Sequence, residues 1–157
     1  MRKVLTLFIL SIIILACKNE TANLVSISGT IKNPIMNAMV INGQHINKTI
    51  NLNADGSFAE TLPIETNGYF TLTYGTKNSL LYLKQGSDLK ISFDAESFNS
   101  SVAFDGNVAN ENNYLVAKSK FYEDNAIDYQ ILFNMEPPGF FQTINKLKTK
   151  TDYFLNK

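Results

Sequence analysis

The sequence predicts a mostly β fold: an antiparallel β-sandwich or barrel of about seven or eight short strands, followed by a helical C-terminal segment. Between residues 24 and 107, short runs with alternating apolar and polar residues recur about every 8–12 residues, as in all-β domains. Gly, Asn and Asp residues lie between these runs, where the chain has to turn. After residue 107 the apolar residues are spaced three or four apart, which is typical of amphipathic helices.

The predicted strands share one pattern, in which every second side chain is apolar and can face a core. The first strand, residues 25–31, shows it with Val25, Ile27 and Ile31. The other strands are expected at residues 39–41, 46–52, 57–62, 69–74, 80–83, 89–93 and 102–104. The expected turns include Asn42-Gly43, Asp55-Gly56 and Lys77-Asn78. Gly56 can adopt the positive φ that a tight hairpin needs.

Helical segments are expected in the last third of the chain at residues 110–124, 126–135 and 140–155, of which the second either continues the first helix or begins a new one. Asn110 is a suitable N-cap for the first helix, and Pro137-Pro138-Gly139 should end the second. The apolar stripe of the third helix begins at Phe140 and still runs at Lys157. Either this helix frays at the C-terminus, or the 157 residues are the front part of a longer protein.

Residues 1–16 are typical of a secretory signal peptide. Arg2 and Lys3 precede an apolar run. As a helix this run would be about 20 Å long, too short for the ~30 Å hydrocarbon core of a bilayer. It ends in Ile14-Leu15-Ala16-Cys17, which resembles the lipobox of bacterial lipoproteins and implies cleavage after Ala16 and a lipid on Cys17. The alternative is that Cys17 is only the apolar end of an ordinary signal peptide.

A lipid on Cys17 would make the membrane a partner of this protein. Two or three acyl chains hold a protein at a membrane almost permanently. We therefore expect a cell-envelope location, lipid-anchored to the outer membrane on its periplasmic or surface face. Lys18-Asn19-Glu20 resembles in part the surface-display signal of Bacteroidetes. The predicted organisation is a signal peptide at 1–16, a tether at 17–23, a β-sandwich domain at 24–107 and a helical extension at 108–157.

The composition excludes several classes of function. The 14 Lys and Arg residues balance the 14 Asp and Glu residues, so the chain lacks the excess of positive charge that nucleic-acid binding requires. One Cys excludes an internal disulfide and a zinc site built from several Cys, and one His excludes a His-rich metal cage. We expect no metal, no cofactor and no nucleic-acid partner.

The strand region contains two weak candidates for catalysis or metal binding. His45 lies in an expected turn, which favours an exposed loop residue over a catalytic base. Oxygen-bearing side chains alternate at Asn51, Asn53 and Asp55, as they do in some calcium sites. No Glu follows at the offset that a calcium loop requires, so a turn is expected there as well.

Two larger groups could serve a ligand if the fold brought their members together. Paired carboxylates can hydrolyse a glycosidic bond, and four lie near expected strand ends: Asp88, Asp94, Glu96 and Asp105. Their spacing selects no pair, so a solvated rim is the default. Aromatic rings can line a sugar-binding face, here Tyr69, Tyr74, Tyr82 and Phe93. Aromatic residues of a sandwich more often belong to its core, and no residue is assigned a catalytic role.

The order of several short motifs resembles the N-terminal β-rich domain of TlpA-like, thioredoxin-family lipoproteins of Bacteroidetes. The motifs are residues 27–31, 55–58, 68–70, 81–91, 104–106 and 112–115. In that family a lipid-anchored sandwich precedes a helical linker and a thioredoxin-fold domain with a C-x-x-C motif. This chain has no C-x-x-C, and thiol–disulfide exchange requires an attacking thiolate and a resolving thiol. The resemblance therefore implies the architecture and the anchor without the oxidoreductase activity.

We expect a non-catalytic, lipid-anchored accessory or interaction module outside the cytoplasm. Its expected partner is a thioredoxin-fold protein or a downstream domain of that fold. The alternative is a cell-surface lipoprotein that binds a glycan or a peptide through its β-sandwich.

Overall fold

The computed structural model describes residues 23–43 and 45–156. The expected signal peptide and Cys17 lie outside these residues. The chain divides into two compact units between Asn112 and Asn113, and each is described here by itself. Within the described residues, no helix is both long and apolar enough to cross a membrane.

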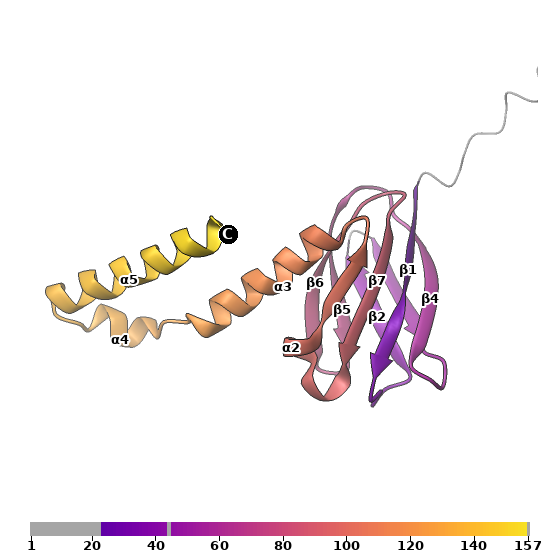
Figure 1. Ribbon diagram of the computed structural model, residues 1–157, viewed down its shortest axis with the longest axis horizontal. Helices are drawn as coiled ribbons and strands as arrows, with labels where there is room; N and C mark the ends of the chain where they lie inside the picture. Colours follow the sequence, from indigo (N-terminus) through magenta and orange to yellow (C-terminus); the bar gives the residue numbers. More distant parts are fainter. Residues whose placement is uncertain (1–22, 44, 157) are drawn as a thin grey trace, which may run out of the picture. The chain divides into compact units, whose positions relative to one another are not determined.

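The first unit is a β-sandwich of two four-stranded sheets, which confirms the predicted fold class and selects the sandwich over the barrel (Figure 1). The first sheet has the strand order β4-β1-β7-β8 and the second has the order β3-β2-β5-β6. The strands are β1 (Leu24–Lys32), β2 (Ala38–Gly43), β3 (Ile46–Asn51), β4 (Ser57–Pro63), β5 (Gly68–Tyr74), β6 (Lys77–Leu83), β7 (Asp88–Asp94) and β8 (Ala103–Gly106).

The pairing is antiparallel throughout the second sheet but mixed in the first. β1 pairs antiparallel with β4 and parallel with β7. The chain visits the second sheet between β1 and β4, and again between β4 and β7. It re-enters the first sheet on the other side of β1 and in the same direction as β1, which makes that one pair parallel. Such non-local pairing cannot be deduced from residue alternation, which reports only which face of a strand is apolar.

Apolar side chains from both sheets fill the space between them. In β1 the predicted residues Val25, Ile27 and Ile31 are at most 1% exposed. The other strands contribute Met39, Ile41, Ile50, Phe58, Leu62, Phe70, Leu72, Tyr74, Leu81, Leu83, Leu89, Ile91, Phe93 and Phe104. Where β3 and β4 form the edges of their sheets, Lys48 Nζ lies 3.2 Å from Glu60 Oε2 and links the two layers.

One predicted turn is confirmed and two are displaced. Gly56 has φ of +80°, and a Cβ there would lie 2.2 Å from the carbonyl oxygen of Ile31, so this turn needs glycine. Asn42 and Gly43 belong to β2, since Gly43 pairs with Ile46 of β3. Lys77 and Asn78 belong to β6, where they pair with Tyr74 and Thr73.

Two short helices lie between β7 and β8, and three helices follow β8 in the described residues. The short helices η3 (Ala95–Ser97) and α2 (Phe98–Ser101), which lie between β7 and β8, were not predicted. The longer region contains α3 (Ala109–Asp124), α4 (Tyr129–Phe133) and α5 (Pro137–Leu155). Asn110 lies inside α3 and is not its N-cap. The two prolines begin α5, because the first turn of a helix has free N–H groups and tolerates Pro.

The second unit is held together mainly by aromatic side chains. The ring of Phe154 in α5 stacks on Phe121 of α3, with centroids 4.7 Å apart, and on Tyr114 at 5.9 Å. Lys150 Nζ also donates a hydrogen bond of 2.6 Å to Asn125 Oδ1. Among residues 113–156, only Leu132 is buried.

Candidate functional site

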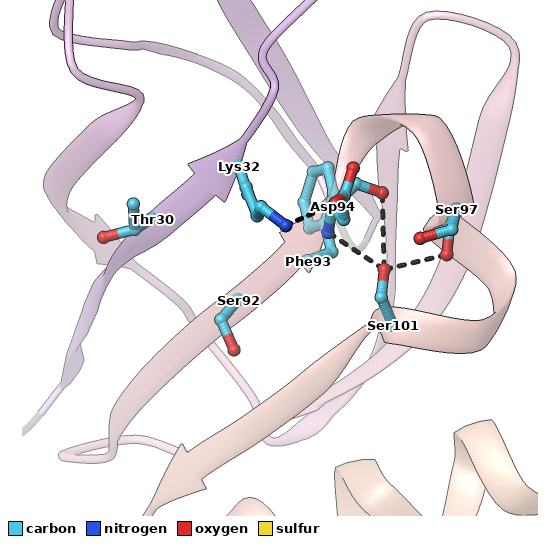
Figure 2. A pocket seen from close by; sticks show the side chains of 7 residues that line it. All are labelled: Thr30, Lys32, Ser92, Phe93, Asp94, Ser97 and Ser101. Carbon is cyan, nitrogen blue, oxygen red and sulfur yellow. Dashed lines mark hydrogen bonds and ion pairs between the residues drawn. The ribbon is translucent and has the colours of Figure 1, made fainter.

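A shallow pocket opens on the outer face of the first sheet (Figure 2). Its volume is about 490 Å³, and it is lined by Thr30, Lys32, Ser92, Phe93, Asp94, Ser97 and Ser101. β1 and β7 form its floor, and the turn of η3 and α2 forms one wall. The Asp94 carboxylate and the Ser101 hydroxyl are the polar groups that hold this wall in place.

The Asp94 carboxylate is fully engaged by neighbouring groups. The backbone N–H of Glu96 donates to Oδ1 at 3.0 Å, and Asn33 Nδ2 donates to both carboxylate oxygens at 3.2 and 3.1 Å. Lys32 Nζ lies 3.3 Å from Oδ2. These groups, the Glu96 N–H above all, hold the pKa of Asp94 below its ordinary value. Asp94 is therefore the N-cap of η3 and is charged at neutral pH.

Ser101 fastens the end of α2 to β7. Its Oγ accepts a hydrogen bond of 2.9 Å from the N–H of Asp94 and donates to the carbonyl oxygen of Ser97 at 2.8 Å. The hydroxyl is thus bonded to the backbone and not to a side-chain base. Asp94 and Ser101 are thus hydrogen-bonded to neighbouring protein groups. We interpret them as residues that stabilise the turn formed by η3 and α2.

The structure does not gather the four candidate carboxylates. Asp88 and Asp94 lie at opposite ends of β7. Asp105 pairs across the strands with Lys90, and its Oδ1 accepts the N–H of Gly106 at 2.8 Å. Within the described ranges, no group of three or more Asp, Glu, His or Cys side chains could hold a metal ion.

The expected turn roles of His45 and of the Asn53–Asp55 segment are confirmed. His45 is exposed between β2 and β3 and has φ of +68°. Asp55 Oδ1 accepts hydrogen bonds from the hydroxyl of Ser57 at 2.6 Å and from its N–H at 2.9 Å. These bonds, the hydroxyl first, lower the pKa of Asp55. Asn53 Nδ2 donates to the same hydroxyl, whereas Asn51 lies apart on β3.

The four aromatic residues do not share one face: Tyr74 and Phe93 have the expected core positions, whereas Tyr69 and Tyr82 do not. Tyr74 and Phe93 are 2% and 3% exposed and pack edge to face in the core. The Tyr74 hydroxyl accepts the N–H groups of Ile35 and Met36 and donates to the carbonyl of Met36, which pins the loop between β1 and β2. Tyr69 and Tyr82 instead lie on the outer face of the second sheet.

We call this outer face the neutral face. It consists of the side chains that alternate with the buried ones along β2, β3, β5 and β6. They are Ala38, Val40, Asn42, Asn47, Thr49, Asn51, Tyr69, Thr71, Thr73, Asn78, Leu80 and Tyr82. None of the side chains in this set carries a charge. The outer face of the first sheet, by contrast, presents Lys32, Asp88, Lys90, Asp94 and Asp105.

Cross-strand register places the polar groups of the neutral face in rows. Tyr69 lies opposite Tyr82, with their rings edge to face and 5.8 Å between centroids. Thr73 Oγ1 donates to Asn78 Oδ1 on the next strand at 2.8 Å. Asn42 lies between Asn47 and Thr71 in the register. The alternation in the sequence had already separated Tyr69 from Tyr74 by face, but it did not show which strands share a sheet.

Asn112 has a structural role that the sequence did not predict. Its side chain is fully buried, although it is polar. Its Oδ1 accepts the N–H of Tyr82 at 2.8 Å, and its Nδ2 donates to the carbonyl oxygens of Tyr82 at 2.9 Å and of Val108 at 2.8 Å. Because β6 is an edge strand, this amide takes the place of a neighbouring strand at Tyr82.

The chain matches no protein-family model and no curated protein. One solved structure is similar to part of it: a "putative cell adhesion protein" from Bacteroides ovatus. The sequence identity is 8% and the TM-score is 0.33. The match covers 54% of this chain and spans 43% of the length of that protein. A likeness at this level assigns neither a family nor a function.

Proposed function

We propose that this protein is a lipid-anchored accessory module of the cell envelope, with no catalytic role of its own. The observation that carries the proposal is the position of its single Cys. Cys17 follows Ile14-Leu15-Ala16 at the place where lipoproteins receive their diacylglyceryl group. A sulfur bound to lipid is unavailable for thiol–disulfide exchange, so the proposed role is to position or dock a thioredoxin-fold partner.

The start of β1 supports a short tether. β1 begins at Leu24, seven residues after Cys17, and seven residues span at most about 25 Å. Leu24 pairs with Pro63, and its carbonyl accepts the N–H of Gly86. A lipid on Cys17 would therefore keep this end of the sandwich near the membrane, at the outer membrane in our proposal.

Intact-mass measurement on protein extracted from native membranes tests the anchor. We expect a chain that begins at Cys17 and carries a diacylglyceryl group. The Cys17→Ser variant should lose its membrane association in a fractionation experiment, while an exposed Ser variant far from the lipobox, such as Ser100→Ala, should keep it. A free thiol at Cys17 in the native protein would overturn the proposal.

A second candidate function is binding of a glycan or a peptide through the sandwich, and the neutral face favours it. Large uncharged faces rich in Asn, Thr and Tyr suit polar ligands without charge. A thermal-shift screen of the soluble form, lacking residues 1–16 and with Cys17→Ser, tests this function. A ligand-dependent rise in melting temperature is the expected result, and the absence of any shift counts against it.

A further inference from the structure

The neutral face differs from the opposite face of the same sandwich in charge. The opposite face presents Lys32, Lys90 and several carboxylates, whereas the neutral face presents amides, hydroxyls and rings together with the aliphatic side chains of Ala38, Val40 and Leu80. Charge complementarity steers and selects charged partners. A face without charge has no such attraction for a polyanion or an acidic peptide, so the chemistry that complements it is polar and uncharged.

Short hydrogen-bonding side chains of the neutral face form a row across three neighbouring strands. Each Asn presents two donor hydrogens and an acceptor oxygen. Asn47, Asn42 and Thr71 follow one another across β3, β2 and β5. Neighbouring strands are about 4.8 Å apart, so the row offers one hydrogen-bonding side chain per strand at close, even intervals. These short side chains also lose less rotamer freedom on binding than Lys or Glu would.

Tyr69 adds a ring beside this row. It precedes Thr71 by one outward position on β5, and its side chain is 61% exposed. Its ring contacts Tyr82 edge to face, which fixes its orientation. A Tyr ring has an apolar face and a polar tip, and an apolar face of this size fits the C–H side of a sugar ring.

We propose that the neutral face binds an uncharged polysaccharide. Tyr69 stacks on one sugar ring, and Asn42 donates to and accepts from the hydroxyls of its neighbour. The inference rests on the second proposed function, binding through the sandwich, and does not depend on acylation of Cys17.

The test is sedimentation of the full chain with insoluble polysaccharides, in a detergent without a sugar headgroup. The probes are cellulose, β-mannan and starch, with cross-linked polygalacturonic acid as the charged comparison. We expect binding to at least one neutral probe and none to the charged one. Tyr69→Ala and Asn42→Ala should each weaken that binding about five- to tenfold. The matched controls Tyr153→Ala, also a largely exposed Tyr, and Asn99→Ala, also an exposed Asn, should leave it unchanged.

Three outcomes overturn the inference and separate it from the function on which it rests. Equal binding by the Tyr69→Ala and Asn42→Ala variants would place the ligand elsewhere on a protein that still binds glycans. Preference for polygalacturonic acid would show that the ligand is a charged polysaccharide, while binding through the sandwich would remain supported. Binding to none of the probes, together with no shift in the thermal screen, would remove both. Circular dichroism of each variant confirms that the sandwich is folded.

Discussion

The sandwich and the helical segment after Asn112 are stabilised in different ways. In the sandwich every strand contributes buried apolar side chains to one core. In the helical segment the described residues bury only Leu132, and large side chains such as Tyr129, Phe133 and Tyr153 are about 70% exposed. α4 depends on a local cap, in which the Asp128 carboxylate accepts the N–H groups of Gln130 and Ile131.

This difference in burial predicts that the sandwich is more stable than the helical segment. Burial of apolar surface is the main favourable contribution to folding, and helices in proteins owe most of their stability to the packing of an apolar face. The helices should therefore open locally at a lower free energy than the sandwich. Changes in one unit should then be measurable without the other, which the following predictions test from the largest effect to the smallest.

The largest effect is expected from Gly29→Ala in β1. A Cβ at this position would lie 1.8 Å from the carbonyl oxygen of Ile91 and 2.9 Å from Cζ of Phe58, so the central strands of the first sheet must move. We expect the free energy of unfolding of the sandwich to fall by about 3–5 kcal/mol. Urea denaturation followed by tyrosine fluorescence measures it.

The matched change in the helical segment is Gly139→Ala. A Cβ there meets only Met135 Cβ, at 3.9 Å, and Ala favours helix. It should leave the urea midpoint of the sandwich unchanged and raise the helical circular dichroism signal. A loss of sandwich stability equal to that of Gly29→Ala would contradict the separation of the units.

Asn112→Ala should have the second largest effect. It leaves the N–H and the carbonyl of Tyr82 without their partner, and unpaired buried polar groups cost about 1–3 kcal/mol. We expect a loss of about 2–3 kcal/mol and faster hydrogen exchange at the Tyr82 amide. Asn113→Ala changes an exposed side chain one residue later and is the control. An equal loss in both variants would refute the edge-capping role.

Phe154→Ala should affect only the helical segment. It removes the rings' stack with Phe121 and Tyr114, worth about 1–2 kcal/mol with the lost burial. The helical circular dichroism signal should melt at a lower temperature, while the transition of the sandwich stays in place. Coincident shifts of both transitions would show that the two units unfold together.

The smallest effect is expected from Glu60→Gln, at the edge of the sandwich. The N–H of Thr61 and then Lys48 hold the pKa of Glu60 below its ordinary value of 4.5. A carboxyl with a lowered folded-state pKa stabilises the fold above its unfolded pKa, and this contribution is lost as the pH falls through the folded value. Glu60→Gln should therefore be slightly less stable than the native chain at pH 7, and this difference should shrink as the pH falls through the folded-state pKa of Glu60. A difference that persists in acid would assign the effect to packing.

Much of the sandwich could be predicted from the sequence, because alternation reports directly on buried and exposed faces. Phe70, Leu72 and Tyr74 fall on one face in both the prediction and the structure. The positions of the turns were predicted less accurately than the faces of the strands. Asn42-Gly43 is a common turn pair, yet Gly43 stays in β2, where its backbone lies close to Phe70.

The role of Asn112 and the composition of the neutral face depend on contacts between distant segments. Tyr82 and Asn112 are separated by 30 residues, and nothing in their local pattern connects them. The neutral face likewise requires β3, β2, β5 and β6 to be neighbours. Sequence alone supplied the residue types of this face but not their assembly.

The amide of Asn112 also has a consequence for association between molecules. An open strand edge recruits strands from other chains, and this leads to aggregation. Asn112 lies in the first turn of α3. Unwinding of that turn would free the backbone N–H and carbonyl of Tyr82 to pair with a strand of another molecule. We therefore expect unwinding of that turn to favour edge-to-edge association of molecules through β6.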